Sequence, residues 1–132
     1  LEVIVLAAGQ GRRMVSRLPK VLHALAGRPM LHHVLDTVAE LAPTGLHVVI
    51  GHAAEAVRAS LPAAADGTGE GPRGTRVHWV EQVEQLGTGH AVGQALPGIA
   101  DGAIALIVYG DVPLVSARTL EACVAAARNG AL

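Results

Sequence analysis

The residues best suited to chemistry follow the first apolar segment, in the stretch LAAGQGRRMVSRLPK that covers residues 6–20. Gly9 and Gly11 permit a tight turn whose backbone N–H groups point inward, and at the carboxyl end of a strand such a turn forms a cradle for an anion. Four cations lie in the same stretch: Arg12, Arg13, Arg17 and Lys20. Because clustered cations repel one another, a bound polyanion best explains their arrangement, and phosphate is the expected ligand.

The glycine-rich stretch lacks the spacing of two common phosphate-binding motifs. The P-loop requires G-x-x-x-x-G-K-[ST], which the chain does not contain, and the dinucleotide fingerprint requires a third small residue where Met14 stands. By itself, Gly9-x-Gly11 is also compatible with a glycine turn that leads into a solvated basic loop.

A carboxylate ends the last apolar segment of the chain. Residues 104–109, IALIVY, are followed by Gly110 and Asp111. Local sequence alone leaves two interpretations for Asp111. It is either a polar residue that ends a strand or a residue that binds a ligand.

Other polar residues are weaker candidates. His32 and His33 are adjacent and cannot share one metal geometry on a helix, and no H-x-x-x-H pair or cysteine partner accompanies them. For His90, packing at the start of a helix is favoured over contact with a ligand. Cys123 cannot form an internal disulfide, and we expect it and Trp79 to be core residues.

Composition and charge narrow the class of protein. The 132 residues suffice for one domain, and they are 51% hydrophobic but only 2% aromatic, as expected of an α/β protein with buried parallel strands. Net charge is −1, yet residues 3–35 hold five cations and no acid. No aromatic side chains interleave with these cations, which disfavours a nucleic-acid surface and favours a compact polyanion. No apolar run reaches the length of a membrane span, so a cytoplasmic protein is expected.

Strand and helix patterns alternate along the chain. Four short apolar runs predict buried strands: 2–6, 46–50, 76–81 and 104–109. Helical patterns cover 31–41, 53–61 and 88–96, and the glycine-rich stretch 63–75 is expected to be a mobile surface excursion. The order predicts a three-layer α/β/α Rossmann-like fold with a mainly parallel sheet, whose ligands bind beyond the carboxyl ends of the strands.

Motifs along the whole chain resemble those of sugar-nucleotide pyrophosphorylases. L-A-A-G-x-G-x-R-M is followed by PKVLHALAGRPMLHHV at 19–34, EQVEQLGTGHA at 81–91 and YGDVPL at 109–114. Together, in this order, they are similar to the bacterial N-acetylglucosamine-1-phosphate uridyltransferases, usually the amino-terminal half of a bifunctional enzyme. The chain begins with Leu1 and not with methionine, so it is expected to be a fragment. The resemblance implies that residues 1–132 are the nucleotide-binding part of such a domain, truncated on its C-terminal side.

The resemblance implies a role for each motif residue. The reaction would transfer UMP from UTP to N-acetylglucosamine 1-phosphate, with Arg13 and Lys20 contacting the phosphates as the catalytic cations. It needs no protein nucleophile, since charge neutralisation and positioning suffice. Gln82 is expected to read uracil, and Asp111 to bind Mg²⁺ through its carboxylate oxygens. The remaining implied nucleotide contacts are Leu6, Ala7, Ala8, Gly9, Gly11, Gly87, Thr88, Tyr109 and Gly110. Thr88 is also a plausible helix N-cap.

The chain also departs from the family pattern. Arg12 stands where the family commonly has Thr, and the second metal ligand, most sugar contacts and the acetyltransferase half are expected beyond residue 132. We therefore expect little turnover from these residues alone, and a homotrimer for the whole protein. Two alternatives stay open: a nucleotidyltransferase with another base or sugar, and a nucleotide-binding module without turnover.

Overall fold

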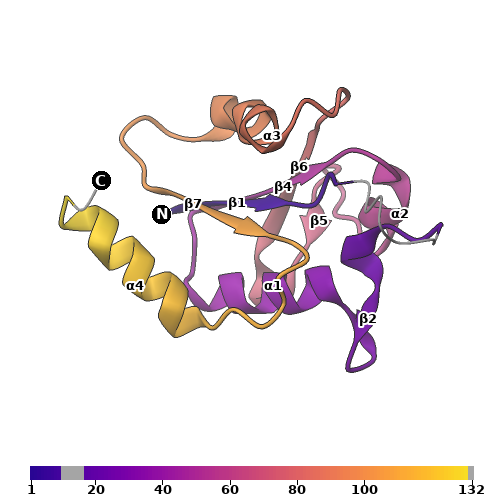
Figure 1. Cartoon of the computed structure of the whole chain (residues 1–132), viewed down its shortest axis with the longest axis horizontal. Helices are drawn as coiled ribbons and strands as arrows, with labels where there is room; N and C mark the ends of the chain where they lie inside the picture. Colours follow the sequence, from indigo (N-terminus) through magenta and orange to yellow (C-terminus); the bar gives the residue numbers. More distant parts are fainter. Residues whose placement is uncertain (10–16, 131–132) are drawn as a thin grey trace.

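The central element of the fold is a five-stranded sheet in the order β5-β6-β4-β1-β7, parallel except for β5 (Figure 1). It is seen in a computed structural model that describes residues 1–9 and 17–130. The strands of this sheet are β1 (Glu2–Leu6), β4 (Gly45–Ile50), β5 (Gly69–Glu70), β6 (Arg76–Glu81) and β7 (Ala105–Tyr109). The α-helices are α1 (Met30–Glu40), α2 (Ala54–Ala59), α3 (Thr88–Ala95) and α4 (Ala117–Arg128).

The two faces of the sheet bury two separate cores. Side chains alternate across a strand, so Val3 and Val5 of β1 face one side, while Ile4 and Leu6 face the other. Val3 and Val5 pack with α1 and with Leu120 of α4, whereas the opposite face packs with α3. Figure 1 shows α3 above the sheet and α1 and α4 below it. The predicted three-layer α/β fold with a mainly parallel sheet is therefore confirmed.

Helix α1 follows from its sequence pattern. Its apolar residues recur at steps of three and four, which places them on one stripe of the helix. Four residues of this stripe are buried: Leu31, Val34, Leu35 and Val38. This stripe anchors α1 against the sheet, and the segment that enters α1 carries Lys20.

The prediction of a buried strand is only partly right for β6, in which Arg76, His78 and Glu81 are exposed. It is also only half right for β7. This strand pairs with β1 on one side and forms the end of the sheet, so Ile107 and Tyr109 are 44% and 49% exposed. An apolar run cannot distinguish a central strand from an edge strand, because both carry the same residue types. The expectation that Cys123 is a core residue is wrong: α4 buries Leu120 and Val124 and leaves the free Cys123 thiol exposed.

The glycine-rich stretch 63–75 contains regular structure that its composition did not predict. β5 pairs antiparallel with β6, and the 3-10 helix Pro72–Gly74 follows it. A Cβ on Gly69 would lie 2.9 Å from Cζ2 of Trp79, so the glycine lets this edge strand cover the indole. Trp79 accordingly packs against the core as a partly buried residue.

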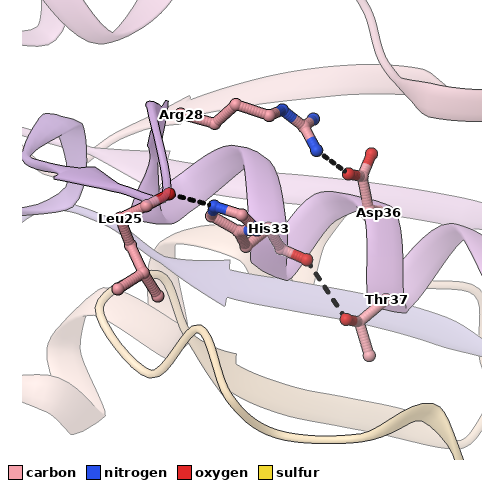
Figure 2. Close-up of polar contacts among 5 residues, drawn as sticks. All are labelled: Leu25, Arg28, His33, Asp36 and Thr37. Atoms are coloured by element: carbon pink, nitrogen blue, oxygen red, sulfur yellow. Dashed lines mark hydrogen bonds and ion pairs between the residues drawn. The ribbon is translucent and has the colours of Figure 1, made fainter.

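A small hairpin fixes the segment between β1 and α1. β2 (Ala24–Leu25) and β3 (Arg28–Pro29) pair antiparallel, and Figure 2 shows how α1 holds them. His33 Nε2 donates to the Leu25 carbonyl at 2.6 Å, and Arg28 Nη1 lies 2.5 Å from Asp36 Oδ2. Arg28 therefore serves this ion pair, although its charge contributed to the basic character of residues 3–35.

Candidate functional site

A cleft of about 330 Å³ opens at the carboxyl ends of the parallel strands, where ligands bind in open α/β sheets. It brings together residues from four separate parts of the chain. Nine of them are site residues predicted from the sequence, and three further residues complete the walls. The lining consists of Leu6, Ala8, Gly9, Lys20, Val21, Gln82, Gln85, Gly87, Thr88, Ala91, Tyr109 and Asp111.

The end of β1 forms the floor of the cleft. Leu6 and Ala8 line it, and Gly9 leaves open space where a side chain would stand. Ala7 points to the other face, where it packs in the core with α1, because successive side chains alternate across a strand. Of the three predicted apolar contacts, the structure therefore places two side chains in the cleft and one behind it.

The basic loop is only partly described. The predicted phosphate contacts Gly11 and Arg13 lie outside the described residues, as does Arg12. Arg17 is exposed and does not line the cleft. Among the described residues of the loop, Lys20 is the cation that reaches the cleft, at the start of the 3-10 helix Lys20–Leu22.

Lys20 and Asp111 face each other across the cleft. Lys20 Nζ lies 2.8 Å from Asp111 Oδ2, with the two side chains 44% and 28% exposed. An ion pair this accessible contributes about 0.2–1 kcal/mol, which a charged ligand can readily replace. The pair therefore places one positive and one negative charge at the rim of the cleft, where a charged ligand could contact both.

Gly110 positions Asp111 without lining the cleft. Its N–H donates to the Leu6 carbonyl at 2.9 Å, which continues the β1–β7 pairing by one residue. A Cβ at this position would lie 3.2 Å from Val21 Cγ1 and 3.3 Å from Leu31 Cδ1. The glycine thus brings the end of β7 close to the core, and the carboxylate that follows emerges at the rim.

The far wall of the cleft begins at Gln82, directly after β6. Its backbone N–H donates to the Ile50 carbonyl at 2.8 Å, and the residue is only 3% exposed. Its Nε2 lies 3.1 Å from the Gly87 carbonyl oxygen and 3.0 Å from His90 Nδ1. A buried amide with these fixed partners is suited to reading the edge of a flat polar ligand.

The start of α3 differs from the prediction for Thr88. The helix begins at Thr88 itself, and the N-cap is Gly87 with φ of 99°, a conformation that favours glycine. Thr88 is therefore the first helical residue and not the cap, and no side chain caps this helix end. Its exposed side chain lines the cleft.

Three lining residues were missed in the sequence: Val21, Gln85 and Ala91. Gln85 lies three residues after Gln82 in the same loop, and its Nε2 donates to the backbone carbonyl of Gln82 at 3.3 Å. Gly51, at the end of β4, supports this loop from behind, since a Cβ there would lie 2.3 Å from Gln85 Nε2. Gln85 could have been predicted from the sequence, because a second side-chain amide three residues after Gln82 lies in the same loop. No local sequence feature marks Val21 or Ala91 as lining residues.

The described residues form no cluster of three or more metal-ligating side chains of the His, Cys, Asp and Glu types. His32 and His33 contact Ser60 Oγ and the Leu25 carbonyl, respectively. Burial lowers the pKa of His32 below its ordinary value, and the charge of Arg28 adds to the effect. Within residues 1–9 and 17–130, no helix is long and apolar enough to span a bilayer.

An open, mainly parallel sheet with a charged cleft at its carboxyl edge is the architecture of α/β proteins that bind ligands at this edge. The comparisons give the family: residues 3–132 match the model of the MobA-like NTP transferase domain. The chain belongs to this family of nucleotidyltransferases. The fold and family therefore agree with the resemblance inferred from the motifs.

Individual relatives agree with this assignment. The chain is 55% identical to the "Bifunctional protein GlmU" of Marinobacter nauticus over 95% of its own length and 25% of that protein. It is 49% identical to the protein of the same name from Legionella pneumophila, over 94% of the chain and 24% of that protein. These matches confirm the similarity to the bifunctional GlmU proteins, of whose length the chain spans about a quarter.

The solved structures give the same fold. The crystal structure of Rv0371c from Mycobacterium tuberculosis superposes with a TM-score of 0.72 at 31% identity, covering 96% of this chain and 59% of that one. A second structure of Rv0371c, at 28% identity with a TM-score of 0.68 over 96% of this chain and 58% of that one, is a complex with manganese.

Proposed function

We propose that the chain is the UTP-binding part of an N-acetylglucosamine-1-phosphate uridyltransferase, which forms UDP-N-acetylglucosamine and pyrophosphate. The observation that carries the proposal is the meeting of Gly9, Lys20, Gln82 and Asp111 in one cleft. These residues lie far apart in the sequence and have the types that a base, a triphosphate and a divalent cation require. Their arrangement at the carboxyl edge of the sheet supports a nucleotide as the ligand.

Each wall of the cleft serves a different part of UTP in this proposal. The amide of Gln82 faces the base, and the small residues Ala8 and Gly9 let the uridine lie against the end of β1. Lys20 contacts the phosphates, together with Arg13 from the loop outside the described residues. The buried amide lies on one wall and the charged pair on another, as binding of a polar base and a polyanion in one cleft requires.

The donor chemistry of Asp111 fits a hard divalent cation. Its carboxylate is partly exposed at the rim of the cleft and already holds one positive charge, the Lys20 ammonium. Mg²⁺ prefers oxygen ligands and typically takes few protein ligands when it binds with a nucleotide. We assign Asp111 as the residue of this chain that would hold Mg²⁺, and manganese in the related Rv0371c supports a divalent metal. When bound, the metal would neutralise charge on the phosphates.

The proposed reaction joins two anions, so the protein must overcome their repulsion. An oxygen of the sugar phosphate attacks the α-phosphorus of UTP, the new P–O bond forms, and the bond to pyrophosphate breaks. The cations Lys20 and Arg13 would stabilise the charge that develops on the departing pyrophosphate. No side chain forms a covalent bond to the substrate in this scheme.

Activity of the whole protein is expected to need residues beyond this chain. The second metal ligand, most sugar contacts and an acetyltransferase half are all assigned to the remainder, and the family resemblance implies a homotrimer. Residues 1–132 alone should therefore bind UTP and turn over little. UDP-N-acetylglucosamine production would place the protein in the synthesis of cell-wall precursors.

Two measurements on the natural full-length protein test the proposal. Equilibrium binding of UTP, CTP, GTP, ATP and dTTP should show a preference for UTP, and equal affinities would refute the base assignment. Pyrophosphate should be released when N-acetylglucosamine 1-phosphate is added with UTP and Mg²⁺. Tight UTP binding without pyrophosphate release would favour a nucleotide-binding module without turnover.

A further inference from the structure

We propose that His90 is a positioning residue that fixes the orientation of the Gln82 side-chain amide. In this orientation the amide presents only its oxygen, Oε1, to the base. The inference rests on the proposed function, because it assigns the base preference of that same cleft. It starts from the short contact between Gln82 Nε2 and His90 Nδ1, 3.0 Å.

The Gln82 amide has one orientation that satisfies its surroundings. Its Nε2 lies 3.1 Å from the carbonyl oxygen of Gly87, which can only accept a hydrogen bond. Turning the amide by half a rotation would place Oε1 against that oxygen in a site that is almost fully buried. Two acceptors facing each other without water are unfavourable, so one amide hydrogen belongs to Gly87.

The second amide hydrogen belongs to His90. Because Nε2 of Gln82 is the donor in this contact, Nδ1 of His90 must accept, and the neutral imidazole then carries its proton on Nε2. Nε2 of the Gln94 side chain lies 3.3 Å from that nitrogen, so in this orientation of the Gln94 amide two donors face each other. Gln94 is exposed and can turn its carbonyl oxygen toward the Nε2 proton, so the chain of contacts is satisfied from Gln94 through His90 to Gln82.

Both hydrogens of the Gln82 amide are therefore engaged within the protein. Oε1 is the remaining polar atom of the side chain, and none of the hydrogen bonds among the described residues uses it. Gln82 lines the cleft, so a base that approaches it meets an acceptor. An acceptor at this position matches a ring N–H, which uracil has at N3 and cytosine lacks.

This arrangement makes His90 a determinant of base preference without contact to the base. If His90 cannot accept a hydrogen bond, one amide hydrogen loses its partner and only the Gly87 carbonyl still opposes the turned orientation, so the amide presents its NH₂ group more often. Uracil then loses its advantage and cytosine, whose N3 is an acceptor, gains a donor. We expect the ratio of CTP to UTP dissociation constants to fall about tenfold, the effect of roughly one buried hydrogen bond.

The test compares two substitutions of one residue in the natural full-length protein. His90→Leu removes the acceptor and keeps apolar bulk, whereas the carbonyl oxygen of His90→Asn can occupy the position of Nδ1 and accept in its place. Dissociation constants for UTP and CTP are measured by calorimetry without sugar phosphate, so that no turnover occurs. His90→Leu should lose the uridine preference, and His90→Asn should retain most of it.

Two further measurements keep the test independent of folding and of the proposed function. His78→Leu is the control, because the exposed His78 stacks on His47 away from the cleft and should leave the ratio unchanged. In the wild-type protein, ¹⁵N NMR should show the His90 proton on Nε2. A proton on Nδ1 would overturn the inference even if His90→Leu fails to fold.

The outcomes separate the two proposals. A wild-type protein that prefers UTP, with a folded His90→Leu variant that keeps the same ratio, would refute the role of His90 alone. A wild-type protein without preference for UTP would refute the base assignment under the proposed function. Rescue of the preference by Asn but not by Leu supports both.

Discussion

The Nζ atom of Lys20 lies 2.8 Å from Oδ2 of Asp111, so the carboxylate assigned to a metal ion is paired with the cation assigned to phosphate. Lys20 is the only lysine in the chain. A metal on this carboxylate and phosphates beside this ammonium would replace one ion pair by two. Breaking the Lys20–Asp111 ion pair costs little free energy, because both side chains are partly exposed.

Removal of the Lys20 charge should have opposite effects on two ligands. In Lys20→Met, UTP binding should weaken, because a cation is lost beside the phosphates. Binding of Mn²⁺ in the absence of nucleotide should tighten by about 1.4-fold to fivefold, because the carboxylate no longer has a competing cation worth about 0.2–1 kcal/mol. Calorimetry with UTP and electron paramagnetic resonance with Mn²⁺ measure the two effects.

Lys20→Arg is the matched control for that experiment, since it keeps the charge. It should resemble the wild-type protein in Mn²⁺ binding. Weaker binding of both ligands by Lys20→Met would contradict the competition and indicate a general disturbance of the site.

Asp111→Asn should remove the dependence of UTP binding on magnesium. The amide keeps the size of the side chain and loses the charge that a hard cation prefers, so enhancement by Mg²⁺ should fall about tenfold or more. UTP binding is titrated with Mg²⁺ in both proteins. An unchanged magnesium titration would exclude Asp111 from the metal site.

Gly51→Ala should disturb the cleft wall that Gln82 and Gln85 form, from behind. A Cβ at this position would lie 2.3 Å from Gln85 Nε2 and 3.0 Å from the backbone oxygen of Gln82. The Gln85 side chain can move, but the backbone of Gln82 must shift, and overpacking of this kind costs about 1–3 kcal/mol. We expect a lower free energy of unfolding in urea together with weaker UTP binding.

Gly93→Ala provides the comparison for Gly51→Ala. Gly93 is also a glycine of the described fold, but a Cβ there meets no atom within 4 Å. It lies in α3, where alanine is favoured over glycine, so stability should stay equal or rise. Equal losses in the two variants would contradict the proposed contact with the loop.

His32 should make stability depend on pH below neutrality. Burial lowers the pKa of His32 in the folded chain, so between its ordinary value of about 6.5 and the lower folded value the unfolded chain binds more protons. The free energy of unfolding should therefore fall as pH decreases through this window. His32→Gln, which can still reach Ser60, should flatten this part of the profile measured in urea from pH 7.5 to pH 5.5.

A buried polar pair at the other end of β1 should contribute to stability. Glu2 Oε2 lies 3.0 Å from His47 Nε2, and Thr44 Oγ1 donates to Glu2 Oε1 at 3.3 Å. Glu2→Leu leaves the buried imidazole without its partner, which should cost about 1–3 kcal/mol in the free energy of unfolding. The exposed Glu121→Leu should change it by less than about 0.5 kcal/mol.

A strand was predictable from the sequence where both of its faces are buried, and a helix where its apolar residues recur with the helical period. β1 and β4 are nearly continuous apolar runs, and α1 has its apolar residues on one stripe, so local patterns sufficed. The exposed face of β7, the extra strand β5 and the exposed Cys123 were not predictable from local patterns. Each depends on what lies beside the segment, which a window of sequence does not contain.

The candidate site was predictable to a similar extent. Motif resemblance selected Lys20, Gln82 and Asp111, and the cleft contains all three. Resemblance did not reveal that Ala7 turns away from the cleft or that Thr88 starts α3 without capping it. These details follow from the alternation of side chains in β1 and from the positive φ of Gly87.

The sequence by itself determined the class of fold and the types of groups that could bind a nucleotide, because hydrophobic period and residue chemistry are local properties. Only the tertiary structure decided the partners: Lys20 with Asp111, Arg28 with Asp36, and Gln82 with His90. The physical reason is that charge and hydrogen-bond direction act over a few ångströms. Which groups come that close is set by the order of the strands and the packing of the helices.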